Sequence, residues 1–168
     1  GRNRVWRKTV IDAIRNDPAW NGGNYTVQPP SLRTAQEIYF FMGSNPILRK
    51  EQMPSLKKSD EVLEETVTKA MRENDANDTL YQISASWDYD PNPGLEKIRA
   101  PLYAVNSQDD LINPPELGIL EREIKRVQHG KAVVIPRSKD TRGHGTHTMA
   151  AVWKQYLQEL MKESERSE

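Results

Sequence analysis

The chain has 168 residues, and its 24 Lys and Arg balance its 24 Asp and Glu, so its net charge is zero with neutral histidines. A basic stripe for nucleic acid and an apolar run of the ~18 residues that span a bilayer are both missing, so we expect neither nucleic acid nor membrane as a partner. The absence of cysteine excludes disulfides, thiolate catalysis and cysteine-ligated zinc, but leaves the compartment open.

Two amphipathic helices are predicted first along the chain. The first covers residues 3–16, is closed by Asp17-Pro18, and has apolar residues on one face at Trp6, Val10 and Ile14. After a loop rich in Gly, Asn and Pro, Ser31 is expected to cap a second helix that ends near Gly43.

A polar linker leads to two further predicted helices. The third carries acidic residues at positions 60–65, which we expect near its positive N-terminal end, and its apolar face holds Leu63, Val67 and Met71. The fourth covers residues 78–87 and is expected to bury Leu80, Ile83 and Trp87.

The segment Asp90-Pro91-Asn92-Pro93-Gly94 ends the helical pattern and marks a predicted domain boundary. We expect residues 1–92 to form a helical cap or lid region and residues 93–168 to form the C-terminal part of an α/β core. The second region has the pattern strand–helix–strand–helix, with a strand at 102–105, a helix from Pro114 to Val127, a strand at 132–135 and a strongly periodic helix from Met149 to Met161.

Two parallel strands do not make a stable sheet by themselves. Parallel sheets are covered by helices on both faces and need further strands, and the predicted helices before residue 90 supply none. We therefore expect the chain to be the C-terminal portion of a larger α/β fold, with an N-terminal portion of the same fold as its partner.

Acidic and imidazole side chains follow the two predicted strands. Asp109 and Asp110 come after the first strand, and His144 comes after the second, in a glycine-flanked loop. Catalytic groups collect at the carboxyl ends of strands in open α/β sheets, and a carboxylate beside an imidazole orients it for proton transfer. The serine hydrolases of this architecture have the chain order Ser, Asp, His, but no Gly-x-Ser-x-Gly occurs in this sequence.

Other interpretations of these residues exist. The aspartates alone could cap a helix before Asn113-Pro114, and His144 alone could be a structural loop residue. His144 and His147, three residues apart, could bind a metal with one aspartate, but no further ligand cluster supports this, so we expect no metal and no cofactor. We expect His147 to position the loop and His129 to be solvated.

Four segments in order resemble one family. The chain is similar over nearly its whole length to the C-terminal half of the homoserine O-acetyltransferase group of α/β-hydrolase-fold proteins. The resemblance rests on the Asp110 and His144 segments and on two stretches nearer the N-terminus, Asp12-Ala13-Ile14-Arg15-Asn16-Asp17-Pro18-Ala19-Trp20-Asn21-Gly22-Gly23-Asn24-Tyr25 and Asp75-Ala76-Asn77-Asp78-Thr79-Leu80-Tyr81.

The resemblance implies the roles of single residues. Asp110, four residues before a proline, matches the family's catalytic acid, and His144 in its Gly-His pair matches the family's base. Residues 1–90 would form the cap over the active site, and the nucleophilic serine and oxyanion-hole amides would lie on an N-terminal portion. The family's acetyltransferases bind homoserine with an Asp after the histidine and with an Arg and a Tyr on the cap, where this chain has Gly145, Gln36 and Gly43. We therefore expect a divergent branch that does not act on homoserine.

These observations predict a serine-dependent enzyme to which this chain contributes Asp110 and His144. We expect carboxyl-ester hydrolysis of a small-molecule ester or acyl donor, and we expect this chain alone to be inactive. An O-acyltransferase with another alcohol as acceptor is the alternative, and a non-catalytic interaction protein that retains the fold is an alternative of another class. A homodimer through the cap is a further open alternative, and the acyl group is left open.

Overall fold

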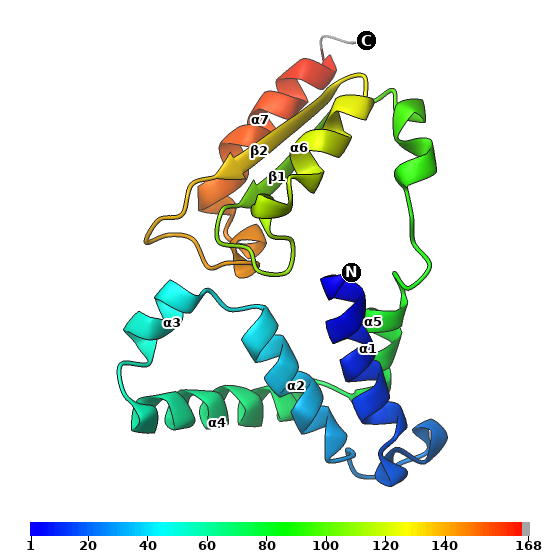
Figure 1. Ribbon diagram of the computed structural model, residues 1–168, viewed down its shortest axis with the longest axis vertical. Coiled ribbons are helices and arrows are strands. Elements are labelled where there is room, and N and C mark those ends of the chain that lie inside the picture. The colour runs from blue at the N-terminus through cyan, green and yellow to red at the C-terminus, as the bar shows by residue number, and fades with distance from the viewer. Residues whose placement is uncertain (166–168) are drawn as a thin grey trace. The chain divides into compact units, whose positions relative to one another are not determined.

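The computed structural model describes residues 1–165, which form two compact units (Figure 1). One unit consists of Gly1–Met42 and Arg49–Tyr89, and the other of Gly43–Leu48 and the chain from Asp90 onward. The segment Gly43–Leu48 therefore belongs to the second unit, although helices of the first unit precede and follow it in the sequence. The domain division at residues 92 and 93 stays a prediction.

The first unit is built from helices. Helix α1 (Arg2–Arg15) packs against α2 (Ser31–Met42) and α5 (Ala76–Ser84), and α2 also packs against α4 (Leu56–Glu73). Fully buried side chains fill the space between these helices, namely those of Val10, Ile14, Leu32, Ala35 and Val67. The apolar faces predicted for the first three helices thus form one core, which stabilises the unit by removal of apolar surface from water.

The loop between α1 and α2 is held by the carboxylate of Asp17. One oxygen accepts a hydrogen bond from Ala19 N at 2.9 Å at the start of a short 3-10 helix, η1 (Pro18–Gly23), and the other accepts one from Ser31 N at 2.9 Å. The prediction that Ser31 caps α2 is wrong by one position, because Ser31 is the first residue of the helix. The N–H of Ser31 instead donates to the carboxylate of Asp17, which precedes the helix by 14 residues.

The beginning of α5 is fixed by Asp75. Its carboxylate caps the helix by accepting from Asn77 N at 2.8 Å and Asp78 N at 3.1 Å. It also accepts from Tyr25 OH at 2.7 and 2.8 Å and from Gln28 Nε2 at 2.6 Å. Asp75 therefore joins the loop before α2 to the start of α5, two stretches far apart in the sequence.

Three predictions between residues 44 and 90 are corrected by the structure. The polar linker contains a helix, α3 (Pro46–Gln52), whose N-terminal amides are capped by Asn45 Oδ1. Helix α4 begins at Leu56 with Ser55 as its cap, so the acidic residues at 60–65 lie beyond its first turn and away from the positive end of the dipole. Trp87 lies after the end of α5 and is not buried; its ring is covered by the guanidinium of Arg4.

The second unit contains a two-stranded parallel sheet, as predicted. Strands β1 (Leu102–Ser107) and β2 (Gly130–Ile135) pair in register from Leu102 with Gly130 to Ser107 with Ile135. Helix α7 (Ala150–Glu165) lies along the sheet, where Tyr103 OH donates to Glu163 at 2.8 Å and Lys131 Nζ lies 2.7 Å from Glu159. Both strands end at the same edge, so the segments that follow them meet there (Figure 1).

The connection between β1 and β2 is not the single helix that we predict from its apolar spacing. It consists of three short helical segments, η3 (Pro115–Leu117), α6 (Ile119–Glu123) and η4 (Ile124–Arg126), and Gly118 with φ 60° interrupts the first two. As a consequence Leu117, expected to face inward, is 58% exposed, whereas Val127 at the end of the segment is buried.

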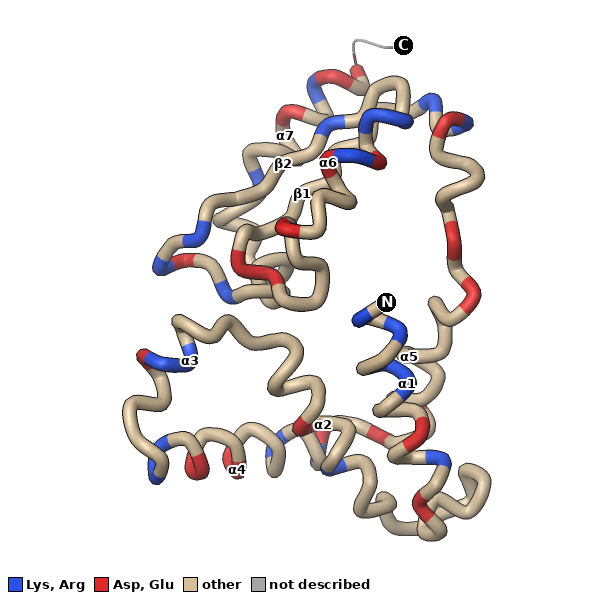
Figure 2. The backbone as a smooth tube through the Cα atoms, in the orientation of Figure 1, with Lys and Arg blue, Asp and Glu red and all other residues tan. Residues whose placement is uncertain are grey.

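Positive and negative side chains are mixed over the described residues, as the balanced composition predicts. Figure 2 shows Lys and Arg interleaved with Asp and Glu along both units, together with an acidic segment after β1. Within residues 1–165, every helix is too short or too polar to cross a membrane. The apolar face of α7 is only partly covered, with Leu157 46% and Met161 56% exposed.

Candidate active site

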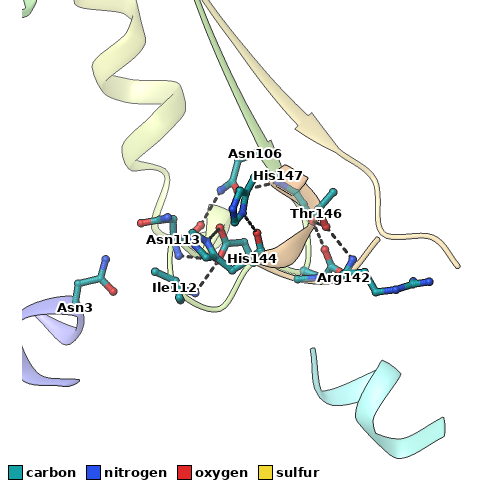
Figure 3. A network of polar contacts seen from close by, with 12 residues as sticks. Asn3, Asn106, Ile112, Asn113, Arg142, His144, Thr146 and His147 are labelled. Carbon is teal, nitrogen blue, oxygen red and sulfur yellow. Dashed lines mark hydrogen bonds and ion pairs between the residues drawn. The ribbon is translucent and has the colours of Figure 1, made fainter. Parts of the chain in front are cut away.

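The two residues predicted as acid and base lie against each other at the carboxyl edge of the sheet. His144 Nδ1 is 3.0 Å from Asp110 Oδ2, and Figure 3 shows the imidazole directed into the loop that follows β1. The side chain of Asp110 is 5% exposed and that of His144 is 36% exposed. The carboxylate is thus shielded from water, while the ring on it remains accessible.

Backbone amides hold Asp110 in this orientation. Its Oδ1 accepts from Ile112 N at 2.7 Å and from Asn113 N at 3.0 Å, so one oxygen serves the turn and the other faces the imidazole. Burial opposes ionisation, but the hydrogen bond with His144 and those from the two amides outweigh it and hold the pKa of Asp110 below its usual value. Asp110 is therefore an anion at neutral pH, as a partner of an imidazolium must be.

The loop that carries His144 has a backbone that requires glycine. Gly143 has φ 59°, and a Cβ placed on it would lie 3.2 Å from the carbonyl oxygen of Asp109. His144 then leads into a short 3-10 helix, η5 (Gly145–Thr148), in which Thr146 Oγ1 accepts from Arg142 N at 2.8 Å and lies 3.3 Å from Ser107 Oγ. Thr146 thereby closes the loop onto the end of β1.

The ring of His147 contacts both the backbone and the ring of His144. Its Nδ1 lies 2.5 Å from the carbonyl oxygen of His144, and the two ring centroids are 5.0 Å apart. The expected role of His147 in positioning the loop stays a prediction. No three His, Cys, Asp or Glu side chains among residues 1–165 gather as metal ligands would, and His129 lies on the exposed turn before β2.

Asp109 has a separate set of hydrogen-bond partners, which the sequence does not predict. It is 9% exposed, and its Oδ2 accepts from Asn45 Nδ2 at 2.5 Å and Thr141 Oγ1 at 2.8 Å. Gly143 N donates to the same oxygen at 3.2 Å, and Ser107 Oγ donates to Oδ1. Burial raises the pKa of Asp109, but these donors more than reverse that effect and leave the pKa below its ordinary value. The only sequence signal was a second acid directly beside the first.

Comparison with solved structures identifies the architecture. The chain superposes on a homoserine O-acetyltransferase from Bacillus anthracis with a TM-score of 0.77 and 19% identity, covering 94% of this chain and 48% of that one. It superposes on an acetylester hydrolase from Corynebacterium glutamicum with a TM-score of 0.70 and 19% identity, covering 96% and 50%. For the esterase E22 the TM-score is 0.78 and the identity 17%, covering 95% and 50%.

These likenesses define the fold. The chain has the C-terminal portion of the α/β-hydrolase fold, with the last two parallel strands, their helices and a helical cap region, as predicted. It spans about half the length of the solved structures that it matches. No protein-family model and no curated protein matches the chain.

Proposed function

We propose that this chain supplies the acid and the base of a serine-dependent carboxyl-ester hydrolase. The observation that carries the proposal is the contact of 3.0 Å between His144 Nδ1 and the buried Asp110, at the sheet edge where α/β proteins place their chemistry. A buried anion on one ring nitrogen and an accessible ring are what general-base catalysis requires.

The roles of the two side chains follow from this geometry. Asp110 accepts the Nδ1–H of His144, so the free lone pair of the neutral imidazole is on Nε2. Nε2 removes the proton of the nucleophilic hydroxyl as its oxygen bonds to the ester carbonyl carbon, and Asp110 stabilises the resulting imidazolium. The imidazolium then protonates the leaving alkoxide, and the same cycle with water in place of the serine releases the acid.

The nucleophile is assigned to the other half of the fold. This sequence has no Gly-x-Ser-x-Gly turn, and it spans about half of each matched structure. We therefore assign the nucleophilic serine, the oxyanion-hole amides and the remaining strands to a polypeptide portion that pairs with β1 and β2. The chain without that portion is expected to have no esterase activity.

Two considerations favour water as the acyl acceptor. Two of the matched proteins are described as an acetylester hydrolase and an esterase, although a third is a homoserine O-acetyltransferase. Gly145 also stands where the resemblance places the carboxylate for an amino-acid acceptor, and a charge-assisted hydrogen bond of that kind is worth about 1.5–3 kcal/mol. A side chain at position 145 would meet only Arg142 Cβ, at 3.6 Å, so space does not require the glycine.

The test uses the chain together with the polypeptide that completes the fold. Hydrolysis of p-nitrophenyl acetate is compared for the wild type, His144→Ala, Asp110→Asn and the exposed control His129→Ala. We expect Asp110→Asn to lower kcat by about 10⁴, as when the acid of a triad becomes an amide, with His144→Ala at least as severe and His129→Ala unchanged. Full turnover in either triad variant, with circular dichroism showing a folded protein, would refute the assignment.

The same assay separates hydrolysis from transfer. Candidate alcohols are added at increasing concentration, and free acid and new ester are quantified. A hydrolase keeps producing acid at the same rate with no new ester, whereas an acyltransferase diverts the acyl group to the alcohol.

A further inference from the structure

Asp109 is a buried carboxylate that the proposed chemistry does not use. A carboxylate shielded from water is costly unless donors replace its hydration. Asp109 has such donors from three separate stretches, because Ser107 ends β1, Asn45 precedes α3, and Thr141 and Gly143 lie in the loop after β2. This one side chain therefore fastens three stretches of backbone together.

One of these donors is next to the proposed base. The N–H that Gly143 donates to Asp109 lies one residue before His144, in a backbone with φ 59°. Thr141, which is 2% exposed, also accepts from Ser138 N at 3.1 Å and so closes the turn that enters this loop. A shift of the Asp109 carboxylate would move the backbone that carries the imidazole.

The two consecutive aspartates contact the same loop at different places. Asp110 meets the ring of His144, and Asp109 meets the backbone just before it. The backbone of Asp110 is held by Ser107, whose carbonyl accepts from Asp110 N at 3.1 Å. The pair thus determines both where the loop lies and how the ring is turned.

We infer that Asp109 is a positioning residue of the active site: its carboxylate holds the loop that presents His144 to Asp110. This inference rests on the proposed function. Asp109 has no contact with the reacting atoms, and it acts through the backbone of Gly143 and the hydroxyl of Thr141.

The test compares Asp109→Asn with Thr141→Val and Thr141→Ser. Thr141→Val nearly preserves shape but removes the hydroxyl that donates to Asp109 and accepts from Ser138 N, and Thr141→Ser keeps that hydroxyl. All are made in the complete protein with its nucleophile-bearing portion. A misplacement of about 1 Å can cost about 100-fold in rate, so we expect Asp109→Asn and Thr141→Val to lower kcat about 10- to 100-fold with KM nearly unchanged. Thr141→Ser is expected to restore the wild-type rate.

A spectroscopic readout separates positioning from mere stability. In protein labelled with ¹⁵N-histidine, the Nδ1–H proton of His144 is expected to give a downfield resonance that weakens or shifts in Asp109→Asn and Thr141→Val and returns in Thr141→Ser. If Asp109→Asn does not fold, the pair of Thr141 variants decides. Folded variants with wild-type kcat and an unchanged Nδ1–H resonance would overturn the inference, as would a loss of kcat that matches the unfolded fraction.

The experiments distinguish failure of this inference from failure of the proposed function. If His144→Ala keeps full turnover, the proposed function fails, and the Nδ1–H resonance alone decides whether Asp109 positions the ring. If His144→Ala abolishes turnover while the Asp109 and Thr141 variants change neither readout, the proposed function stands and the positioning role is wrong.

Discussion

Replacing Gly143 by alanine should destabilise the second unit in two separable ways. The left-handed backbone at φ 59° costs an L-residue roughly 1–2 kcal/mol. The new Cβ would also lie 3.2 Å from Asp109 O, beside ordinary contacts of 3.5 Å with Asn45 N and Gly43 O, and the overpacking at the first contact costs about 1–3 kcal/mol. Alanine returns about 0.4–1 kcal/mol by restricting the unfolded chain. We expect the free energy of unfolding to fall by about 2–3 kcal/mol.

Two other glycines of the same unit serve as matched controls. Gly118 has nearly the same φ, 60°, but a Cβ added to it would meet nothing within 4 Å, so Gly118→Ala should cost only about 1 kcal/mol. Gly145 has no positive φ and an ordinary contact at 3.6 Å, so Gly145→Ala should be neutral or slightly stabilising. Urea unfolding and hydrogen exchange of the β1 and β2 amides measure the three values. Equal losses of unfolding free energy for Gly143→Ala and Gly118→Ala would show that crowding around Gly143 makes no contribution, and would refute this reasoning.

Three further outcomes are expected. Folding lowers the pKa values of Asp109 and Asp110, so the stability that they contribute is present above the unfolded pKa of about 3.9. That stability is lost as the pH falls through the lower folded pKa values. The unfolding free energy of Asp109→Asn should therefore fall less steeply with acidification than that of the wild type. Gly130→Ala should lower the unfolding free energy by about 1–3 kcal/mol or more, because its Cβ would lie 2.5 Å from Ile124 O; an unchanged urea midpoint would contradict this contact. Asp75→Ala should cost at least the roughly 1 kcal/mol of a lost helix cap and raise hydrogen exchange at the start of α5, and unaltered exchange there would argue against the cap.

Periodicity predicted the packed faces of the fold well and the helix ends less well. In α1 the residues spaced every four positions, Trp6, Val10 and Ile14, are buried, because a single helix face meets the core. In α2 the same holds for Leu32, Ala35 and Met42. The segment 114–127 has a similar spacing but is broken by Gly118 in a left-handed conformation. A glycine permits that conformation without requiring it, so the break depends on tertiary packing and cannot be read from local pattern.

The part of the candidate site that lies at the ends of the two strands was predictable from the sequence. Asp110 and His144 were identified because each follows a strand, and parallel strands bring their carboxyl ends to one edge. The role of Asp109 was not predictable, since its donors include Asn45, which precedes it by 64 residues. Nothing in the sequence between them indicates that the segment around Asn45 packs in the second unit.

The placement of Asn45 has a practical consequence for dissecting the protein. The chain enters the second unit twice, first at Gly43–Leu48 and again from Asp90 onward. A truncation that starts at Asp90 would keep both strands, Asp110 and His144, yet it would leave Asp109 without the amide at 2.5 Å. The unit that carries the site is therefore discontinuous in sequence, and no single cut yields an intact copy of it.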